Sequence, residues 1–225
     1  MPENGMSISK LSPTGTGAGS LDVTLDGITP LPDGIIACIK TYLARDIGPG
    51  LAYGTLPAGI TLERLTGPDA ARYRRIFATL GTRWLWWSRL QLDAGELSGV
   101  LAHPAVEAHA VLRDGVEIGL LELDFRAPAA ADLAFLGLFD TATGQGLGKA
   151  LMQTALARVS ASGARRLTVN TCTFDHPAAL GFYRKAGFAV MSQAIEAVPD
   201  PRLTGLLPPH AAPHVPLATA PRTNP

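Results

Sequence analysis

A glycine-rich loop, Thr143-Gly144-Gln145-Gly146-Leu147-Gly148, followed by Lys149 and Ala150, has the residue types and spacing of a phosphate-binding site. Glycine lacks Cβ, so such a loop can adopt positive φ and bring its N–H groups close to a ligand. The amphipathic helix that begins here adds unpaired N–H groups and the positive end of its dipole. Together these features bind phosphate or pyrophosphate, and Lys149 adds a positive charge.

The spacing of the glycines separates this loop from two well-known phosphate-binding patterns. A Walker A loop requires Gly-x-x-x-x-Gly-Lys-Ser/Thr, but Thr143 stands at its first glycine and Ala150 at its hydroxyl residue. A Rossmann fingerprint requires Gly-x-Gly-x-x-Gly between parallel strands, whereas this loop reads Gly-x-Gly-x-Gly after a predicted antiparallel meander. A nucleotide-binding Rossmann protein is therefore an alternative that the sequence disfavours.

Two segments resemble the Gcn5-related N-acetyltransferase (GNAT) family. The glycine loop matches the family pattern Gln/Arg-x-x-Gly-x-Gly/Ala except at Thr143. Residues 171–188 are similar to the late signature Asn-x-x-Ala-x-x-x-Tyr-x-Lys-x-Gly-Phe, with His176 in place of Asn. The residues in register are Ala179, Tyr183, Lys185, Gly187 and Phe188. The resemblance extends over residues 57–190, and the Thr-Cys-Thr-x-Asp-His-Pro element at 171–177 is similar to a bacterial subgroup.

This resemblance implies an α/β (α+β) fold of the GNAT acyl-CoA N-acyltransferase type, with a mixed, mostly antiparallel central sheet flanked by helices. It implies an N-acetyltransferase that moves an acetyl group from acetyl-CoA to a primary amine by direct attack in a ternary complex. We expect the amine to belong to a small molecule. A protein-amine acetyltransferase and a non-catalytic acyl-CoA-binding module are the alternatives.

The resemblance also implies where acetyl-CoA binds. Its pyrophosphate is expected at Gly144–Ala150, and its pantetheine arm is expected to add like a strand between residues 135–139 and 169–171. Gly137 near a strand end favours a bulge or a close backbone approach, and an N–H near Leu138 is expected to stabilise the oxyanion. The residues expected to contact the cofactor are Leu138, Phe139, Gly144, Gln145, Gly146, Leu147, Gly148, Lys149, Ala150, Thr171, His176, Phe182 and Tyr183.

Tyr183 matches the family tyrosine that protonates the departing thiolate. A phenol titrates near 10 and a thiol near 8.5, so Tyr183 is protonated at neutral pH and close enough in acidity to share a proton with sulfur. The alternative is that Tyr183 only packs beneath the cofactor.

Three carboxylates are candidates for the base that deprotonates the amine. Asp132 stands where histone-modifying members of the family keep a glutamate, and Glu122 and Asp124 share one face of the preceding strand. The commoner fate of such residues is a solvated carboxylate on a strand face. A water relay without any protein base is the remaining alternative.

Two positions depart from the family pattern. Thr143 removes a long polar side chain from the pyrophosphate, which leaves backbone groups, Lys149 and Gln145 to bind it. His176 is expected either to cap the next helix or to contact the cofactor, and Thr173 and Asp175 are competing caps.

All three tryptophans of the chain lie within Trp84-Leu85-Trp86-Trp87, close before Arg89. In the family this region covers the acceptor site, so Trp86, Trp87 and Arg89 are candidate substrate contacts, with rings suited to an apolar or cationic acceptor. The alternative is a hydrophobic plug between helices and sheet.

Composition bounds the partners. The chain has 225 residues, 47% of them hydrophobic and 17% charged, which is typical of a globular protein. Nineteen basic and nineteen acidic residues cancel, so we expect no nucleic-acid partner. There is no apolar run of the roughly 20 residues that span a membrane, and the N-terminus does not resemble a secretory signal. Cys38 and Cys172, as lone thiols, favour the cytoplasm, and the histidines and cysteines lack the spacing of a metal site.

Periodicity predicts the elements that position these residues. Strands are predicted at 34–43, on the sheet edge, and at 59–65, 106–112, 116–125, 132–139 and 165–171, with 188–191 opening a last hairpin. Helices are predicted at 68–80, after a capping box at Asp93, from Leu147 to Gly163 and at 177–186. We expect residues 1–33 to be a flexible leader, 34–198 a single domain and 199–225 a Pro-rich extended tail. The apolar residues within 201–207 are expected to dock on the domain or on a partner subunit; a disordered linker is the alternative. A homodimer is a further expectation.

Overall fold

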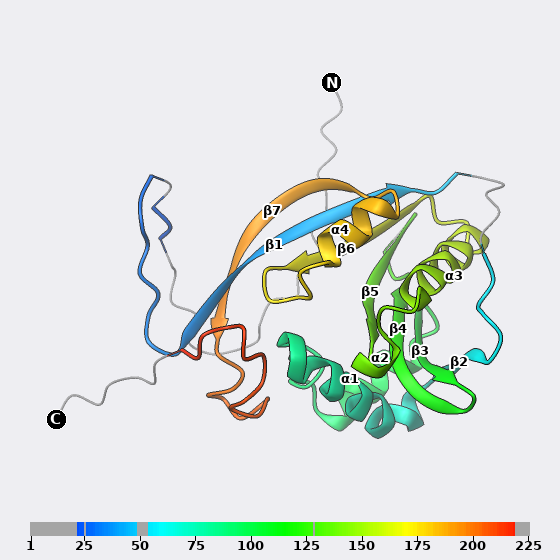
Figure 1. Ribbon diagram of the computed structural model, residues 1–225, viewed down its shortest axis with the longest axis horizontal. Coiled ribbons are helices and arrows are strands. Elements are labelled where there is room, and N and C mark those ends of the chain that lie inside the picture. The colour runs from blue at the N-terminus through cyan, green and yellow to red at the C-terminus, as the bar shows by residue number, and fades with distance from the viewer. Residues whose placement is uncertain (1–21, 25, 49–53, 128, 219–225) are drawn as a thin grey trace. The chain divides into compact units, whose positions relative to one another are not determined.

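The computed structural model describes residues 22–24, 26–48, 54–127 and 129–218, so most of the predicted leader and the last residues of the predicted tail lie outside the described residues. The chain divides into two units, Met1–Leu31 and Pro32–Pro225. The described part of the second unit contains the helices and strands shown in Figure 1. Its strands are β1 (Ile35–Asp46), β2 (Ile60–Leu65), β3 (Val106–Arg113), β4 (Val116–Asp124), β5 (Ala130–Leu138), β6 (Arg166–Cys172) and β7 (Ala189–Pro199). Its helices are α1 (Ala70–Trp84), α2 (Ala94–Ala102), α3 (Leu147–Ala161) and α4 (Ala179–Lys185), with short 3-10 turns at Gly67–Asp69 and Asp140–Ala142.

The described strands form one seven-stranded sheet in the order β2-β3-β4-β5-β6-β1-β7. Every neighbouring pair is antiparallel except β5 and β6, which run parallel. The tight turn predicted at Asp114-Gly115 is confirmed, with φ of 49° and 82° at its two residues, as two-residue hairpin turns require.

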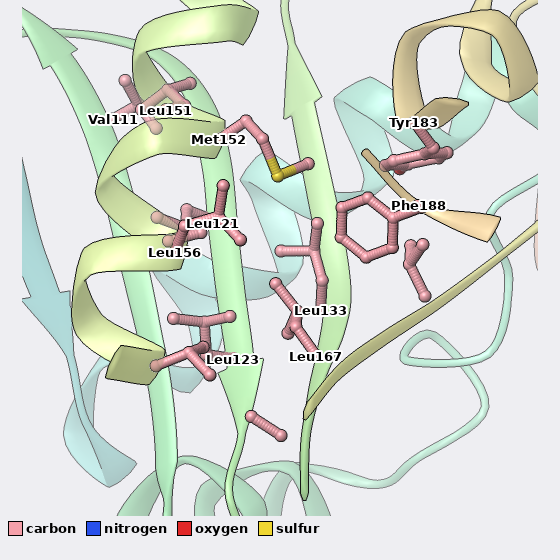
Figure 2. Close-up of a cluster of buried hydrophobic side chains, with 14 of the residues drawn as sticks. Val111, Leu121, Leu123, Leu133, Leu151, Met152, Leu156, Leu167, Tyr183 and Phe188 are labelled. Atoms are coloured by element: carbon pink, nitrogen blue, oxygen red, sulfur yellow. The ribbon is translucent and has the colours of Figure 1, made fainter. Parts of the chain in front are cut away.

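Alternate residues of β4 point to the two faces of this sheet. Leu120 packs with side chains of α1 and α2, whereas Leu121 and Leu123 pack beneath α3. Figure 2 shows this second cluster, in which Tyr183 and Phe188 close one end. The sheet therefore carries a hydrophobic layer on each face, and the two layers hold β5 between them.

The predicted capping box of α2 is confirmed. The Asp93 carboxylate accepts from the Glu96 N–H, and the Glu96 carboxylate accepts from the Asp93 N–H, each at 2.8 Å. This reciprocal pair satisfies two N–H groups at the helix start.

Two predictions about strand placement are wrong. The strand predicted on the sheet edge is β1, which lies inside the sheet between β6 and β7. No hairpin follows residue 188, because β7 pairs along its length with β1. Periodicity reports the faces of a strand and not its neighbours, and here the partners are distant in sequence.

The segment after β7 was expected to be extended, but residues 200–218 form successive turns. Leu207, Ala211, Ala212 and Val215 are buried in one cluster with Ile36 of β1 and Leu85. The prolines interrupt regular structure here, yet the apolar residues between them give the segment an area to bury against the domain.

Candidate active site

The glycine loop presents an open backbone surface at the start of α3. Gly144 and Gly146 have φ of 74° and 77°, and a Cβ at either would meet no heavy atom within 4 Å. The N–H groups of Leu147 and Gly148 precede the first hydrogen bonds of α3, whereas those of Lys149 and Ala150 donate to the Gly146 carbonyl at 3.1 and 3.3 Å. The Lys149 side chain is exposed in the first turn. The loop therefore leaves open space next to its backbone at Gly144 and Gly146.

Arg113, at the end of β3, adds a charge to this loop that the sequence did not indicate. Its Nη2 donates to Oε1 of Gln145 at 2.6 Å, and Nε2 of Gln145 donates to the Thr141 carbonyl at 3.1 Å. The Gln145 side chain thus braces the loop and holds a guanidinium beside it. Gly148 is bordered by Phe182, whose ring carbon would lie 3.6 Å from a Cβ there.

The pairing between β5 and β6 ends at Asp132 and Thr168. These two residues are the last pair in the parallel ladder, and the Thr168 hydroxyl donates to Oδ1 of Asp132 at 2.7 Å. Beyond them, β5 stays paired with β4 and β6 with β1, so their facing edges diverge (Figure 1). The splayed strand ends predicted from the family resemblance are confirmed, and their open edges fit an extended amide-bearing chain.

Trp86 connects the two diverging strands. Its Cη2 would lie 2.9 Å from a Cβ at Gly137 of β5, and its Nε1 donates to Oδ1 of Asp175, just after β6, at 2.9 Å. Asp175 also accepts from the Thr171 hydroxyl at 2.7 Å. The groups that lie closest to the position of a Cβ at Gly137 are thus side chains, the Trp86 indole and Leu80, and not a backbone. The register irregularity lies earlier on β5, between Leu133 and Phe135.

Tyr183 of α4 is buried in the hydrophobic cluster that also contains Leu147 at the start of α3. Its ring lies 5.4 Å from Phe182 and 5.9 Å from Phe188. Burial raises the pKa of the Tyr183 hydroxyl, and the charges of Asp175 and Asp132 raise it further. The neutral phenol is therefore the form present at neutral pH, and Tyr183 is a weaker acid than an exposed tyrosine.

Asp132 is an aspartate whose pKa is raised, chiefly by burial and then by the charges of Asp124 and Glu122. The Thr168 hydroxyl acts in the opposite direction and lowers this pKa, but burial prevails. A carboxylate with a raised pKa is a stronger base than an exposed one. Asp132 lies where β5 and β6 separate, next to the open edges.

Glu122 is fully buried and its charge is compensated. It accepts from Nη2 of Arg89 at 2.6 Å and from the Tyr73 hydroxyl. The Arg89 guanidinium lies 5.2 Å over the Phe135 ring, and its buried Nε has no hydrogen-bond partner among the described residues. Tyr73 was not a sequence candidate, because its helical spacing indicated only a core residue.

The remaining candidates divide between the site and its supports. Nδ1 of His176 accepts from the Ala178 N–H at 3.0 Å, in the turn before α4, and the His176 ring lies 4.9 Å from Trp84. The start of α4 has no side-chain capping hydrogen bond, so the expected cap by His176 is wrong. Trp87 packs on the buried cluster of the C-terminal segment. Leu138 and Phe139 pack against opposite hydrophobic layers, and the Leu147 side chain is buried. Among the described residues no group of three or more His, Cys, Asp and Glu side chains is arranged to hold a metal ion.

Comparison with protein families decides the assignment. Residues 73–188 match the model of the acetyltransferase (GNAT) family. The chain belongs to this family. The GNAT match begins within α1 and ends before β7, so it covers the glycine loop, the diverging strands and α4. A comparison with curated proteins gave no match.

Solved structures share the GNAT fold at low sequence identity. A GCN5-related N-acetyltransferase from Kribbella flavida has a TM-score of 0.50 and 20% identity, over 76% of this chain and 63% of that one. One from Sphaerobacter thermophilus has a TM-score of 0.51 and 17% identity, over 72% and 51%. An aminoglycoside acetyltransferase from an uncultured soil metagenomic sample, in complex with sisomicin, has a TM-score of 0.51 and 17% identity, over 61% and 93%. The chain thus spans about half to two thirds of the first two structures, and the likeness confirms the predicted fold class.

No helix among the described residues is both long and apolar enough to cross a bilayer.

Proposed function

We propose that this protein transfers the acetyl group of acetyl-CoA to a primary amine of a small molecule within a ternary complex. The observation that carries the proposal is the parting of β5 and β6 at Asp132 and Thr168, with the glycine loop following β5 and Tyr183 packed beside it. Acetyl-CoA supplies the activated thioester when bound. The protein supplies its binding surface, a proton donor and a proton acceptor.

Acetyl-CoA binding is assigned to backbone groups of the loop and strands and to two cationic side chains. The N–H groups of Gly144–Gly148 are assigned to the diphosphate, with the Lys149 and Arg113 side chains as the flanking cations. The open edges of β5 and β6 are assigned to the pantetheine arm. The Leu138 N–H is assigned to the oxyanion.

Proton transfer is assigned to Tyr183 and Asp132. Tyr183 holds its proton at neutral pH and donates it to the departing sulfur. Asp132 is preferred over Glu122 as the acceptor of the ammonium proton, because Arg89 and Tyr73 already neutralise and hydrogen-bond Glu122. If Glu122 took up the proton, it would lose its charge and leave the buried Arg89 charge uncompensated, which costs free energy.

The acceptor is assigned to the α1 and α2 face of the sheet, with Trp86 as a wall. The indole packs on Gly137 of β5 and donates to Asp175 just after β6, so it lies beside the diverging strands to which the pantetheine arm is assigned. The aminoglycoside acetyltransferase among the similar structures makes amine-bearing small molecules the first class to test. We place the protein in the reducing cytoplasm because both of its cysteines are free thiols. We assign the Thr171–Pro177 element to a bacterial subgroup of the GNAT family.

The test is release of free thiol from acetyl-CoA with a panel of diamines, amino acids, aminoglycosides and a lysine-rich peptide. We expect turnover with at least one small amine, and a loss of at least about 10²-fold in kcat for Tyr183→Phe with cofactor affinity retained. Turnover confined to the peptide would favour a protein-amine acetyltransferase. Micromolar acetyl-CoA binding without turnover of any amine would favour a binding module, and absence of binding would contradict the proposal.

A further inference from the structure

Residues 200–218 form a compact segment that is fastened by a buried ion pair. The Arg202 guanidinium donates to both carboxylate oxygens of Asp200, at 2.9 and 2.7 Å, and neither side chain is more than 2% exposed. The same guanidinium donates to the carbonyls of Val215 and Pro216, and the Ala218 N–H donates back to Asp200. One pair therefore ties the beginning of the segment to its end.

The segment holds the chain that leads into the tryptophans. The Ala212 N–H donates to the carbonyl of Thr82, in the last turn of α1, at 2.8 Å. Leu85, which ends α1 in the left-handed region with φ of 52°, is buried against Leu207 and Val215. The chain turns at Leu85, and Trp86 follows directly after this turn. Contacts at Thr82 and Leu85 therefore fix the position at which Trp86 begins.

His214 reaches from this segment to the other side of the site. Its ring lies 5.3 Å from the Trp84 ring, and its Nε2 lies 3.0 Å from the carbonyl of Phe174. Phe174 immediately precedes Asp175, the residue that Trp86 binds. The exposed His214 thus contacts both Trp84–Trp87 and the loop after β6. Trp86 links the same two stretches through its hydrogen bond to Asp175.

We propose that residues 200–218 form a wall of the acceptor site, with His214 as the positioning residue that sets Trp84–Trp87 against the β6–α4 loop. The inference rests on the proposed function and adds the element that controls acceptor affinity. None of the segment's contacts described above involves Gly144–Ala150, so we expect the diphosphate site to be independent of the segment. The GNAT match ends at residue 188, before this segment begins.

The test compares His214→Ala with His210→Ala, an exposed histidine of the same segment. We expect His214→Ala to raise the KM for the best amine about 5- to 10-fold, the loss of roughly one hydrogen bond and one ring contact, with kcat and the Kd of acetyl-CoA within about twofold of wild type. His214→Gln, which keeps an N–H donor for the Phe174 carbonyl, should recover part of the KM. His210→Ala should change none of these quantities.

Intrinsic fluorescence gives a readout that does not need turnover. Because all three tryptophans lie in Trp84–Trp87, emission reports on this loop alone. We expect His214→Ala, and not His210→Ala, to shift the emission. An unchanged emission, an unchanged amine KM, or equal losses in amine and cofactor binding would each overturn the inference. If wild type turned over no amine, the proposed function would fail, and the emission shift alone would support or overturn the positioning role.

Discussion

Arg89 and Glu122 form a buried ion pair, with 2.6 Å between Nη2 and Oε1, on the sheet face that also carries Asp132. Only 11% of the Arg89 side chain and none of the Glu122 side chain is exposed. Both charges have therefore left water, and each depends on the other for compensation.

Removing one partner of this pair is expected to destabilise the fold. Arg89→Met leaves Glu122 buried and unpaired, and should lower the free energy of unfolding by about 3–5 kcal/mol in urea titrations. Arg83→Met, which breaks an exposed pair with Asp140, should cost no more than about 1 kcal/mol. The double variant Arg89→Met with Glu122→Leu should recover most of the loss. Equal effects of Arg89→Met and Arg83→Met would show that burial does not set the strength of the pair.

Asp132→Asn is expected to remove the proposed base while keeping the shape of the side chain. The value of kcat should fall by about 10²- to 10⁴-fold, with acetyl-CoA affinity unchanged in calorimetry. Asp124→Asn is the matched control, because Asp124 lies opposite Asp132 on β4 but pairs with Arg126. A larger loss for Asp124→Asn than for Asp132→Asn would assign the base elsewhere.

Thr168→Val is expected to move the pH dependence of the reaction. The Thr168 hydroxyl stabilises the Asp132 carboxylate and so lowers its pKa; without it the pKa, already raised by burial, rises further. The base must be unprotonated to act, so the acidic limb of the kcat/KM profile should shift to higher pH. A shift to lower pH, or none, would argue against Asp132 as the titrating group.

Gly146→Ala tests the glycine loop by backbone strain alone. A Cβ at Gly146 meets no atom within 4 Å, but its φ of 77° costs an alanine about 1–2 kcal/mol. Acetyl-CoA binding, measured by calorimetry, should weaken by about 5- to 30-fold. Gly181→Ala, where a Cβ also has open space and φ is not positive, should leave binding unchanged.

His109 is expected to make stability depend on pH. Burial, with help from Arg158 and Arg64, lowers the pKa of His109 from 6.5 to about 3. The folded state then keeps the ring neutral while the unfolded state takes up a proton, so stability is complete above pH 6.5 and is lost as the pH falls toward 3. The loss between pH 6.5 and 5 should be on the order of 1–2 kcal/mol, and His109→Leu should flatten this part of the curve in urea titrations.

The local elements of this fold were predictable because their signals are local. The Asp93–Glu96 capping box, the Asp114-Gly115 turn and the glycines before α3 each depend on residues within a few positions of one another. The order of the strands was not predictable in the same way. The interior position of β1 depends on pairing with β6 and β7, which hydrophobic periodicity does not specify.

The candidate site shows the same division. Tyr183 and the loop were found from motifs, and their placement beside the diverging strands agrees with the family pattern. Arg113 and Tyr73 were missed because strand order brings Arg113 to the loop and because Tyr73 is spaced like an ordinary core residue. The sequence left three carboxylates as candidate bases, and the contacts of Arg89 with Glu122 and of Thr168 with Asp132 are the structural basis for preferring Asp132.

The interior position of β1 has a consequence for synthesis on the ribosome. β1 precedes all the other described strands, yet its two partners are β6 and β7. Four strands and three α-helices lie between β1 and β6, and α4 separates β6 from β7. During translation β1 must wait with both edges unpaired, a state that favours aggregation and slow acquisition of the native topology. We therefore expect nascent chains that stop before residue 166 to need chaperones until the missing partners emerge.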